Sequence, residues 1–268
     1  FQLPAYSELQ NLRYLEELDL SNPSNVSDSS LETIFGKMPS LKNLVLKVAA
    51  YKVTSRTDYE FRNLEARNNY ITGVYAKDEK YSPNSSVSEF QLRTLDLSSS
   101  QSHVPGQPFP NFLYHQRHLQ FLDLSHDSFR GKGLSQLYQG TILFYISGIN
   151  LSNNSLTGEI PPEFGNFTNI KVLNLSHNFL SGSIPSTFSN LKQIESLDLS
   201  YNKLNGTIPN NLVELNFLAD FSVAHNNLSG KTLGNVAQFG TFDESSHQGN
   251  DLLCGWPLPK KLLPHKRG

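Results

Sequence analysis

The side chains with the greatest capacity for chemistry in this sequence are eight histidines and a single cysteine. His126, His177 and His225 each stand one residue before an Asp or Asn, in the contexts Ser-His-Asp, Ser-His-Asn and Ala-His-Asn. Histidines stacked in one column could bind a metal ion or respond to acidity. The sequence favours a variable, solvent-exposed position instead, because Tyr201 interrupts the column between two of them. We therefore expect no metal site.

Cys254 and the remaining motifs do not indicate catalysis. Cys254 belongs to no His/Asp motif that would mark a nucleophilic thiol, and as the only cysteine it cannot form a disulfide within the chain. His115 and His118 fit exposed histidines on one surface segment. The sequence contains no phosphate-binding glycine loop, no H-E-x-x-H motif and no kinase signature. These observations predict a protein that is not an enzyme and that needs no cofactor.

The composition argues against nucleic-acid binding and against a membrane span. Hydrophobic residues make up 37% of the 268 residues and charged residues 17%, which is ordinary for a chain with a packed core. The net charge of −2 offers no basic face for nucleic acid. The most apolar stretch, 143–149, is far shorter than the roughly 20 residues of a membrane-spanning helix. The chain starts Phe-Gln-Leu-Pro without a signal-peptide pattern, so we expect a piece of a longer protein.

Asn-X-Ser/Thr sequons favour an extracellular glycoprotein. They include Asn25, Asn84, Asn153, Asn166, Asn174, Asn205 and Asn227. The single cysteine by itself would favour a reducing compartment. The sequons together favour secretion.

A repeat of 24 residues positions these side chains. Asn154, Asn178, Asn202 and Asn226 follow one another at this interval, within the pattern Leu-x-x-Leu-x-Leu-x-x-Asn-x-Leu-x-Gly. Each Leu-x-Leu predicts a short strand with alternate side chains buried, and each Asn is expected to bond backbone groups where the chain turns. The predicted fold is a leucine-rich-repeat solenoid. It has a curved parallel β-sheet on its concave face and short 3₁₀ or α helices and irregular turns on its convex face.

The Leu-Ser-x-Asn-x-Leu-x-Gly-x-Ile-Pro form of this repeat resembles that of plant extracellular receptors. Residues 138–152 resemble the junction where a non-repeat island gives way to the last four repeats in plant receptor-like proteins, which lack a kinase. Residues 237–242 and 249–258 resemble the C-terminal cap of that family. The family cap has a second cysteine where this chain has Leu262. The chain is therefore identified as the C-terminal ectodomain portion of such a protein, truncated or degenerate.

This resemblance, combined with the repeat, divides the chain into four parts. Residues 1–130 hold irregular repeats, and a stretch near 47–89 is either a degenerate turn or an inserted loop. Residues 131–145 are the remnant of an island junction, 146–236 hold four regular repeats, and 237–268 form the cap and tail. We count eight clear turns and one doubtful turn at 61–73.

The resemblance also implies a function. It implies a non-catalytic recognition module at the extracellular face of the plasma membrane, or secreted, that acts in defence or developmental signalling. Its partners would be a peptide or protein ligand, a co-receptor kinase of the somatic-embryogenesis type and an adaptor kinase. A similar Q-F-x-T-F segment docks this co-receptor in the brassinosteroid and phytosulfokine receptor kinases. By that resemblance Gln238 and Thr241 would touch the co-receptor, while Phe239 and Phe242 would seal the last turn, and structural capping alone is the alternative.

Exposed side chains of the predicted sheet are the candidates for ligand binding, because parallel strands present an extended row of residues. In the regular repeats these are Asn150, Ser152, Lys171, Asn174, Ser176, His177, Glu195, Asp198, Tyr201, Asp220, Ser222 and His225. Tyr201 is the expected aromatic anchor. Two other functions stay open: a secreted enzyme inhibitor of the polygalacturonase-inhibiting type, and a non-functional truncated decoy.

Overall fold

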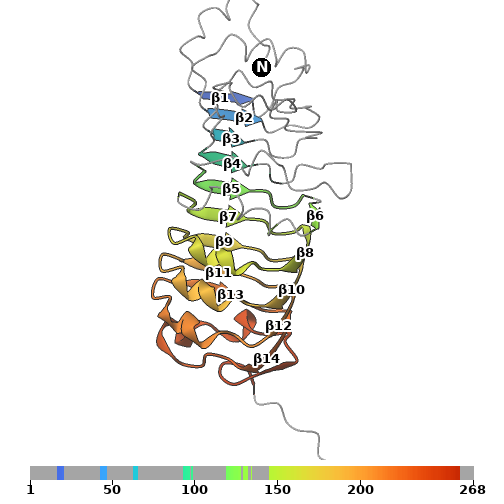
Figure 1. Ribbon diagram of the computed structural model, residues 1–268, viewed down its shortest axis with the longest axis vertical. Coiled ribbons are helices and arrows are strands. Elements are labelled where there is room, and N and C mark those ends of the chain that lie inside the picture. Colours follow the sequence, from blue (N-terminus) through green and yellow to red (C-terminus); the bar gives the residue numbers. More distant parts are fainter. Residues whose placement is uncertain are drawn as a thin grey trace, which may run out of the picture.

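In the computed structural model the chain is a solenoid whose turns stack along one axis (Figure 1). The structure describes residues 17–20, 43–46, 63–65, 93–96, 98, 119–127, 129–131, 134 and 145–259. Nine parallel strands form one sheet, and their order in the sheet is their order in the chain. They are β1 (Glu17–Leu20), β2 (Asn43–Leu46), β3 (Asn63–Glu65), β4 (Thr94–Asp96), β5 (Phe121–Asp123), β7 (Gly148–Asn150), β9 (Val172–Asn174), β11 (Ser196–Asp198) and β13 (Asp220–Ser222).

A second parallel sheet of six strands runs along one flank of the stack (Figure 1). Its strands are β6 (Arg130–Gly131), β8 (Ser155–Glu159), β10 (Phe179–Ser183), β12 (Lys203–Gly206), β14 (Asn227–Lys231) and β15 (Leu252–Cys254). This second sheet was not predicted from the sequence. Each Leu-x-Gly segment buries its leucine and lies beside an equivalent segment of the next turn, so the backbone groups of successive turns can pair.

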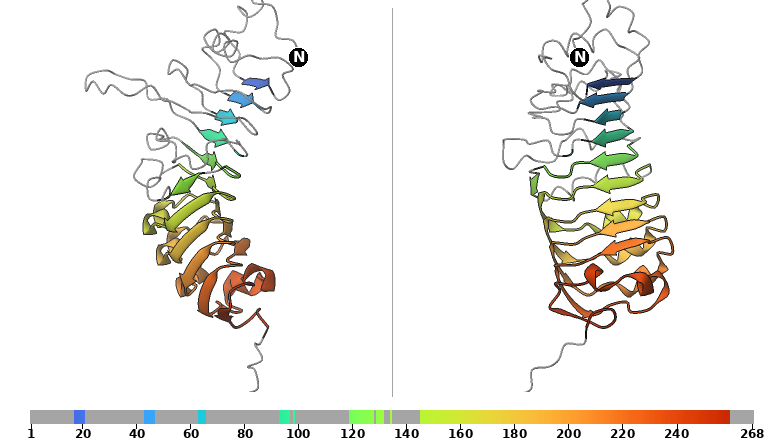
Figure 2. Two further views of the ribbon diagram at one scale, coloured as in Figure 1. Left: turned by 90° about the vertical axis from the view of Figure 1, so that its right-hand side faces the viewer. Right: turned by 180° about the vertical axis from the view of Figure 1, so that it is seen from behind.

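The short helices predicted for the far side of the coil are 3₁₀ helices. They are η4 (Pro162–Asn166), η5 (Ser186–Asn190), η6 (Asn210–Glu214) and η7 (Ala237–Thr241). Another 3₁₀ helix, η8 (Glu244–Ser246), lies instead beside β13 at the end of the nine-stranded sheet, where the N–H of Val223 donates to the Ser246 carbonyl at 2.9 Å. The first three begin after Pro161, Pro185 and Pro209, whose extended backbone turns the chain into the helix. Figure 2 shows that the turns carrying these helices are stacked in the same order as the strands.

The leucines of successive turns form one continuous core, as predicted. Leu151, Leu175 and Leu199 are fully buried. In the strands, Leu173 of β9 is the register partner of Leu197 of β11. No turn could bury these side chains alone, so burial of each leucine depends on its neighbours in the stack.

The predicted asparagine ladder is present, and each rung joins two turns. The Nδ2 amide of Asn178 donates to the carbonyl of Leu151 in the preceding turn at 2.9 Å, and to those of Leu175 and Ser176 in its own. Its Oδ1 accepts from the N–H of Leu156 at 3.0 Å. The side chain therefore satisfies backbone groups that the bend would leave buried without partners.

Asn154, Asn202 and Asn226 make the same set of hydrogen bonds, each one turn along. Asn250 forms a fifth rung, with its amide on the carbonyl of Val223 and its Oδ1 on the N–H of Leu228. This rung was not predicted, although Asn250 follows Asn226 at the repeat interval. The repeat thus continues into the cap.

Two irregular parts of the chain keep the sheet continuous. The doubtful turn at 61–73 supplies β3, which pairs with β2 and β4. Across the expected island junction, Leu122 of β5 is the direct register partner of Ile149 of β7. These residues are 27 apart instead of 24, and the two strands still pair directly.

Candidate protein-binding surfaces

Three of the ligand-binding candidates also shape the turn that follows their strand. The side-chain Oδ1 atoms of Asn150, Asn174 and Asp198 accept hydrogen bonds of 3.2, 3.0 and 2.9 Å from the N–H two residues further on. This is the local turn that Asn and Asp side chains favour. One oxygen of each is thus bound within the chain, and the Nδ2 amide of Asn150 is bound as well, since it donates to Asp123 Oδ2 at 3.0 Å. Only the remaining polar atoms of Asn174 and Asp198 are available to a partner.

Two candidates are buried and cannot contact a ligand directly. Ser152 and Ser176 are 8% and 4% exposed. The prediction assumed that side chains alternate between the two faces beyond the end of the strand. The strand ends at Asn174, and the chain turns there. The hydroxyl of Ser176 donates to Asn174 Oδ1 at 2.7 Å, so this serine supports the turn instead of facing solvent.

The other candidates lie at the surface. Lys171, His177, Glu195, Tyr201 and Asp220 are exposed, and Asn150, Asn174, Asp198, Ser222 and His225 are half-buried. Lys171 Nζ and Glu195 Oε1 form an exposed ion pair of 2.8 Å, so each neutralises the other.

Val172 and Ser196 belong to the same surface and were missed by the sequence analysis. Val172 is 37% exposed, and Ser196 is its register partner in the next strand. Each directly precedes a buried leucine, so alternation along the strand turns it to the opposite face. That spacing could have identified both residues.

Tyr201 fills the histidine column instead of interrupting it. Its ring stacks on His177 with centroids 4.2 Å apart and on His225 at 4.3 Å. Earlier in the same column, the Asn153 amide nitrogen lies 3.1 Å from His126 Nδ1. Both faces of the tyrosine ring are covered, so only its edge and hydroxyl remain for a partner. Among the described residues, no three His, Cys, Asp or Glu side chains are grouped so that they could hold a metal ion.

The two phenylalanines of the cap pack inside the last turn. Phe239 and Phe242 are 1% and 6% exposed, and their rings meet edge to face at 5.3 Å. Both lie against Phe221 of β13, at 5.0 and 5.5 Å. The burial of these rings accounts for the Phe spacing of the Q-F-x-T-F segment.

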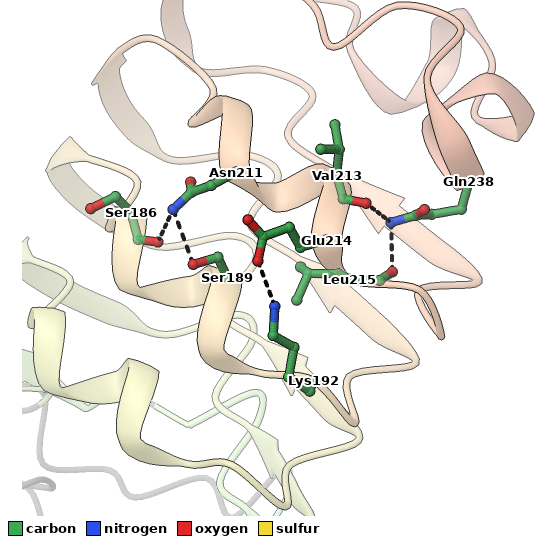
Figure 3. A network of polar contacts seen from close by, with 8 residues as sticks. All are labelled: Ser186, Ser189, Lys192, Asn211, Val213, Glu214, Leu215 and Gln238. Atoms are coloured by element: carbon green, nitrogen blue, oxygen red, sulfur yellow. Dashed lines mark hydrogen bonds and ion pairs between the residues drawn. The ribbon is translucent and has the colours of Figure 1, made fainter.

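Gln238 reaches inward to the preceding turn, as Figure 3 shows. Its Nε2 amide donates to the carbonyl oxygens of Leu215 and Val213, at the end of η6. Thr241 is exposed, and its hydroxyl donates to the Gln238 carbonyl at 2.7 Å. Of the two residues expected to touch a co-receptor, one therefore has its amide donor bound within the chain and the other projects from the surface.

Similar side-chain bonds join the earlier 3₁₀ helices. The Asn211 amide in η6 donates to the carbonyl of Ser186 and the hydroxyl of Ser189 in η5, both at 3.0 Å (Figure 3). Lys192 Nζ lies 2.7 Å from Glu214 Oε2. The Gln238 contact thus extends a set of links between neighbouring turns into the cap.

Cys254 lies in β15, the edge strand of the six-stranded sheet. It is exposed, and its thiol donates to the carbonyl of Gly230 at 3.3 Å. The sequon residues Asn153, Asn166, Asn205 and Asn227 are also exposed, whereas Asn174 is half-buried in β9. Asn25 and Asn84 lie outside the described residues.

Comparisons with known proteins agree with this geometry. Models of the leucine rich repeat match residues 146–167 and 168–228. Cuscuta receptor 1 of Solanum lycopersicum is 70% identical over 154 residues, which cover 55% of this chain and 14% of that protein. Receptor-like protein 41 of Arabidopsis thaliana is 36% identical over 178 residues, which cover 64% and 18%. The chain is a leucine-rich-repeat protein of the plant receptor-like family.

The solved structures agree with the fold of this receptor-like chain. The crystal structure of a TDR receptor superimposes with a TM-score of 0.65 at 26% identity, covering 84% of this chain and 37% of that one. The predicted leucine-rich-repeat solenoid is thereby confirmed. The chain spans less than a fifth of the curated relatives named above, 14% and 18% of their length. In the described part of the chain, no helix is long and apolar enough to cross a membrane.

Proposed function

We propose that this receptor-like chain is a non-catalytic recognition module that works outside the cell, at the plasma membrane or secreted. The observation that carries the proposal is the uncovered face of the nine-stranded sheet. Polar and charged side chains recur there at the repeat interval, including Asn174, Asp198 and Ser222, in register on neighbouring strands. Such a row suits an extended peptide or a protein surface, which binds by many contacts of moderate strength.

Two further features support this location and class. The exposed sequon residues Asn153, Asn166, Asn205 and Asn227 could carry glycans without disturbing the core. The relatives at 70% and 36% identity are named a receptor and a receptor-like protein. The resemblance to receptor-like proteins that lack a kinase implies that a partner would supply the kinase for signalling.

The cap is the proposed docking element for that partner, a co-receptor kinase ectodomain of the somatic-embryogenesis type. Buried Phe239 and Phe242 fix the cap to β13, and Thr241 projects from it. A ligand on the sheet would strengthen this association if it contacted both proteins, and an adaptor kinase would then complete the complex. Defence or developmental signalling is the proposed setting.

Binding between the purified chain and a co-receptor ectodomain tests the docking step. We expect Thr241→Ala to weaken binding about tenfold, the loss of a well-placed hydrogen bond at an interface. Thr207→Ala is the matched control, because Thr207 is also exposed but follows β12 of the other sheet. Equal binding by Thr241→Ala and the unchanged protein would remove the cap from the docking surface.

A further inference from the structure

Two sequon asparagines stand side by side on the six-stranded sheet. Asn205 of β12 begins the sequon Asn-Gly-Thr, and Asn227 of β14 begins the sequon Asn-Leu-Ser. The two strands are parallel, and these asparagines are direct register partners. Their Cα atoms are therefore about 4.8 Å apart, the spacing of neighbouring strands. The repeat interval of 24 residues would instead match Asn205 with Ser229, so the sequence alone does not show this relationship.

Both asparagine side chains point away from the core. Each is the neighbour in its strand of a fully buried leucine, Leu204 or Leu228, so alternation along the strand turns the asparagine to the outer face. Asn205 and Asn227 are exposed. Both amide nitrogens are thus accessible, and any group attached to them would leave the protein on the same face of the sheet.

The two strands stay in close contact just after the asparagines. The hydroxyl of Ser229 in β14 donates to the carbonyl of Gly206 in β12 at 3.2 Å. A Cβ placed on Gly230 would lie only 3.1 Å from Thr207 Cγ2. The ladder between β12 and β14 therefore fixes the distance between the asparagines, and the pair cannot move apart without breaking it.

We propose that Asn205 and Asn227 form a single glycosylation site, at which a glycan on either asparagine excludes a glycan on the other. In the transfer, C1 of the first sugar leaves the pyrophosphate of a lipid-linked oligosaccharide and bonds to the asparagine Nδ2, while an amide proton is lost to the leaving pyrophosphate. The attached sugar is a ring with an N-acetyl arm, and it is broader than the spacing between two strands. Two such sugars on register partners would overlap or would force β12 away from β14.

A glycan at this site would cover the flank and leave the proposed binding face open. The six-stranded sheet runs along one flank of the stack, and the nine-stranded sheet is a separate surface (Figure 1). Asn150 and Asn174 also begin sequons, but they lie in the nine-stranded sheet, and the Asn150 amide is bound to Asp123 Oδ2 at 3.0 Å. The inference rests on the extracellular location in the proposed function and assigns the flank as the modified side.

A single tryptic peptide reports the occupancy of both asparagines. Cleavage after Lys203 and Lys231 releases residues 204–231, which contain no other sequon and no internal lysine or arginine. The mass of this peptide, from the full chain secreted by plant cells behind a signal peptide, counts the glycans on each molecule. We expect one glycan, with the doubly glycosylated form at least about tenfold rarer than independent occupancy would give, a factor that corresponds to about 1.4 kcal/mol.

Variants test whether each asparagine can be modified when the other is absent. In Asn205→Gln the glycan should be found on Asn227, and in Asn227→Gln it should be found on Asn205, so both variant peptides carry one glycan. Asn210→Gln is the matched control, because Asn210 is exposed in the same peptide but begins no sequon. It should leave the distribution of glycans unchanged.

A second peptide from the same digest gives the comparison. Residues 133–171 hold the exposed sequon residues Asn153 and Asn166, which lie in different elements and should be glycosylated together. Two glycans on most copies of 204–231, or a single-asparagine variant that stays bare, overturns the shared site and leaves the proposed function standing. Absence of glycans from both peptides contradicts the shared site and also the sequon argument for an extracellular location.

Discussion

The ring of Tyr201 lies nearly parallel to that of His177, with 4.2 Å between centroids and 10° between planes. His225 covers the other face at 4.3 Å. All three residues have left-handed backbone conformations, with φ between 52° and 54°. Such a conformation costs about 1 kcal/mol or more for a bulky residue. Stacking between rings of successive turns offsets part of this cost, so the column stabilises the repeat at a place where glycine or asparagine would be expected.

Removal of the Tyr201 ring should destabilise the fold measurably. Tyr201→Ala loses both stacking contacts, and we expect the free energy of unfolding to fall by about 1–3 kcal/mol, since an aromatic pair contributes about 0.5–1.5 kcal/mol. Tyr201→Phe keeps the ring and should change stability by less than about 0.5 kcal/mol. Denaturant unfolding monitored by circular dichroism makes the comparison. Equal stability of Tyr201→Ala and Tyr201→Phe would show that the stacking contributes nothing.

Substitution of a ladder asparagine should lower the free energy of unfolding more than substitution of a surface asparagine. Asn178→Leu removes an amide that satisfies four backbone groups, and we expect a loss of about 1–3 kcal/mol in the free energy of unfolding for the groups left unpaired. Asn190→Leu is the control, because Asn190 is exposed at the end of η5. Its free energy of unfolding should stay within about 0.5 kcal/mol of that of the unchanged protein. Comparable losses in both variants would contradict the role of the ladder.

The leucine columns and asparagine rungs could be predicted because each turn repeats the same local rule. Leu151 and Asn154 need only the spacing of their own repeat to be placed. The six-stranded sheet could not be foreseen in this way, since a Leu-x-Gly segment has no strand pattern of its own. It becomes a strand because a second copy lies next to it, as β10 lies beside β12. That pairing is a property of the stack.

The candidate binding surface was predicted less well because its residues depend on where the strand ends. Ser176 was expected at the surface, but the turn after Asn174 buries it. Gln238 was expected to face a partner, but its amide reaches the carbonyl of Leu215. Long polar side chains can reach inward or outward from the same backbone position, and sequence spacing does not distinguish the two.

Close packing between η4 and η5 should make Gly165 intolerant of even one methyl group. A Cβ at this position would lie 2.4 Å from the Thr187 carbonyl oxygen and 2.6 Å from its Cβ. Since these atoms are backbone or fixed by it, the helices would have to move apart, and we expect Gly165→Ala to cost about 1–3 kcal/mol of stability. Asn166→Ala, at an exposed neighbouring position, is the control. A Gly165→Ala variant as stable as this control would mean that the turns can separate freely.

His247 makes the cap sensitive to acidity. It takes the buried place that Val223 has one turn earlier, is 2% exposed, and lies 5.8 Å from the Phe221 ring. Burial lowers the pKa of the imidazole below its ordinary value of 6.5, although the Asp243 carbonyl at 3.1 Å opposes the shift. The folded chain thus favours the neutral ring, whereas the unfolded chain binds a proton near pH 6.5.

Stability should therefore fall as the pH drops below about 6.5, and should stop falling from this cause once the pH is below the pKa of the folded state. His247→Phe removes the titrating group from the same apolar site. Melting temperatures measured from pH 7.5 to 5 should decline more steeply for the unchanged protein than for His247→Phe, and the difference isolates His247 from the carboxylates that titrate in both. Parallel declines would mean that protonation of His247 is not linked to unfolding. A steeper decline for the unchanged protein would show that acidity destabilises the cap, which is the element proposed to dock a co-receptor.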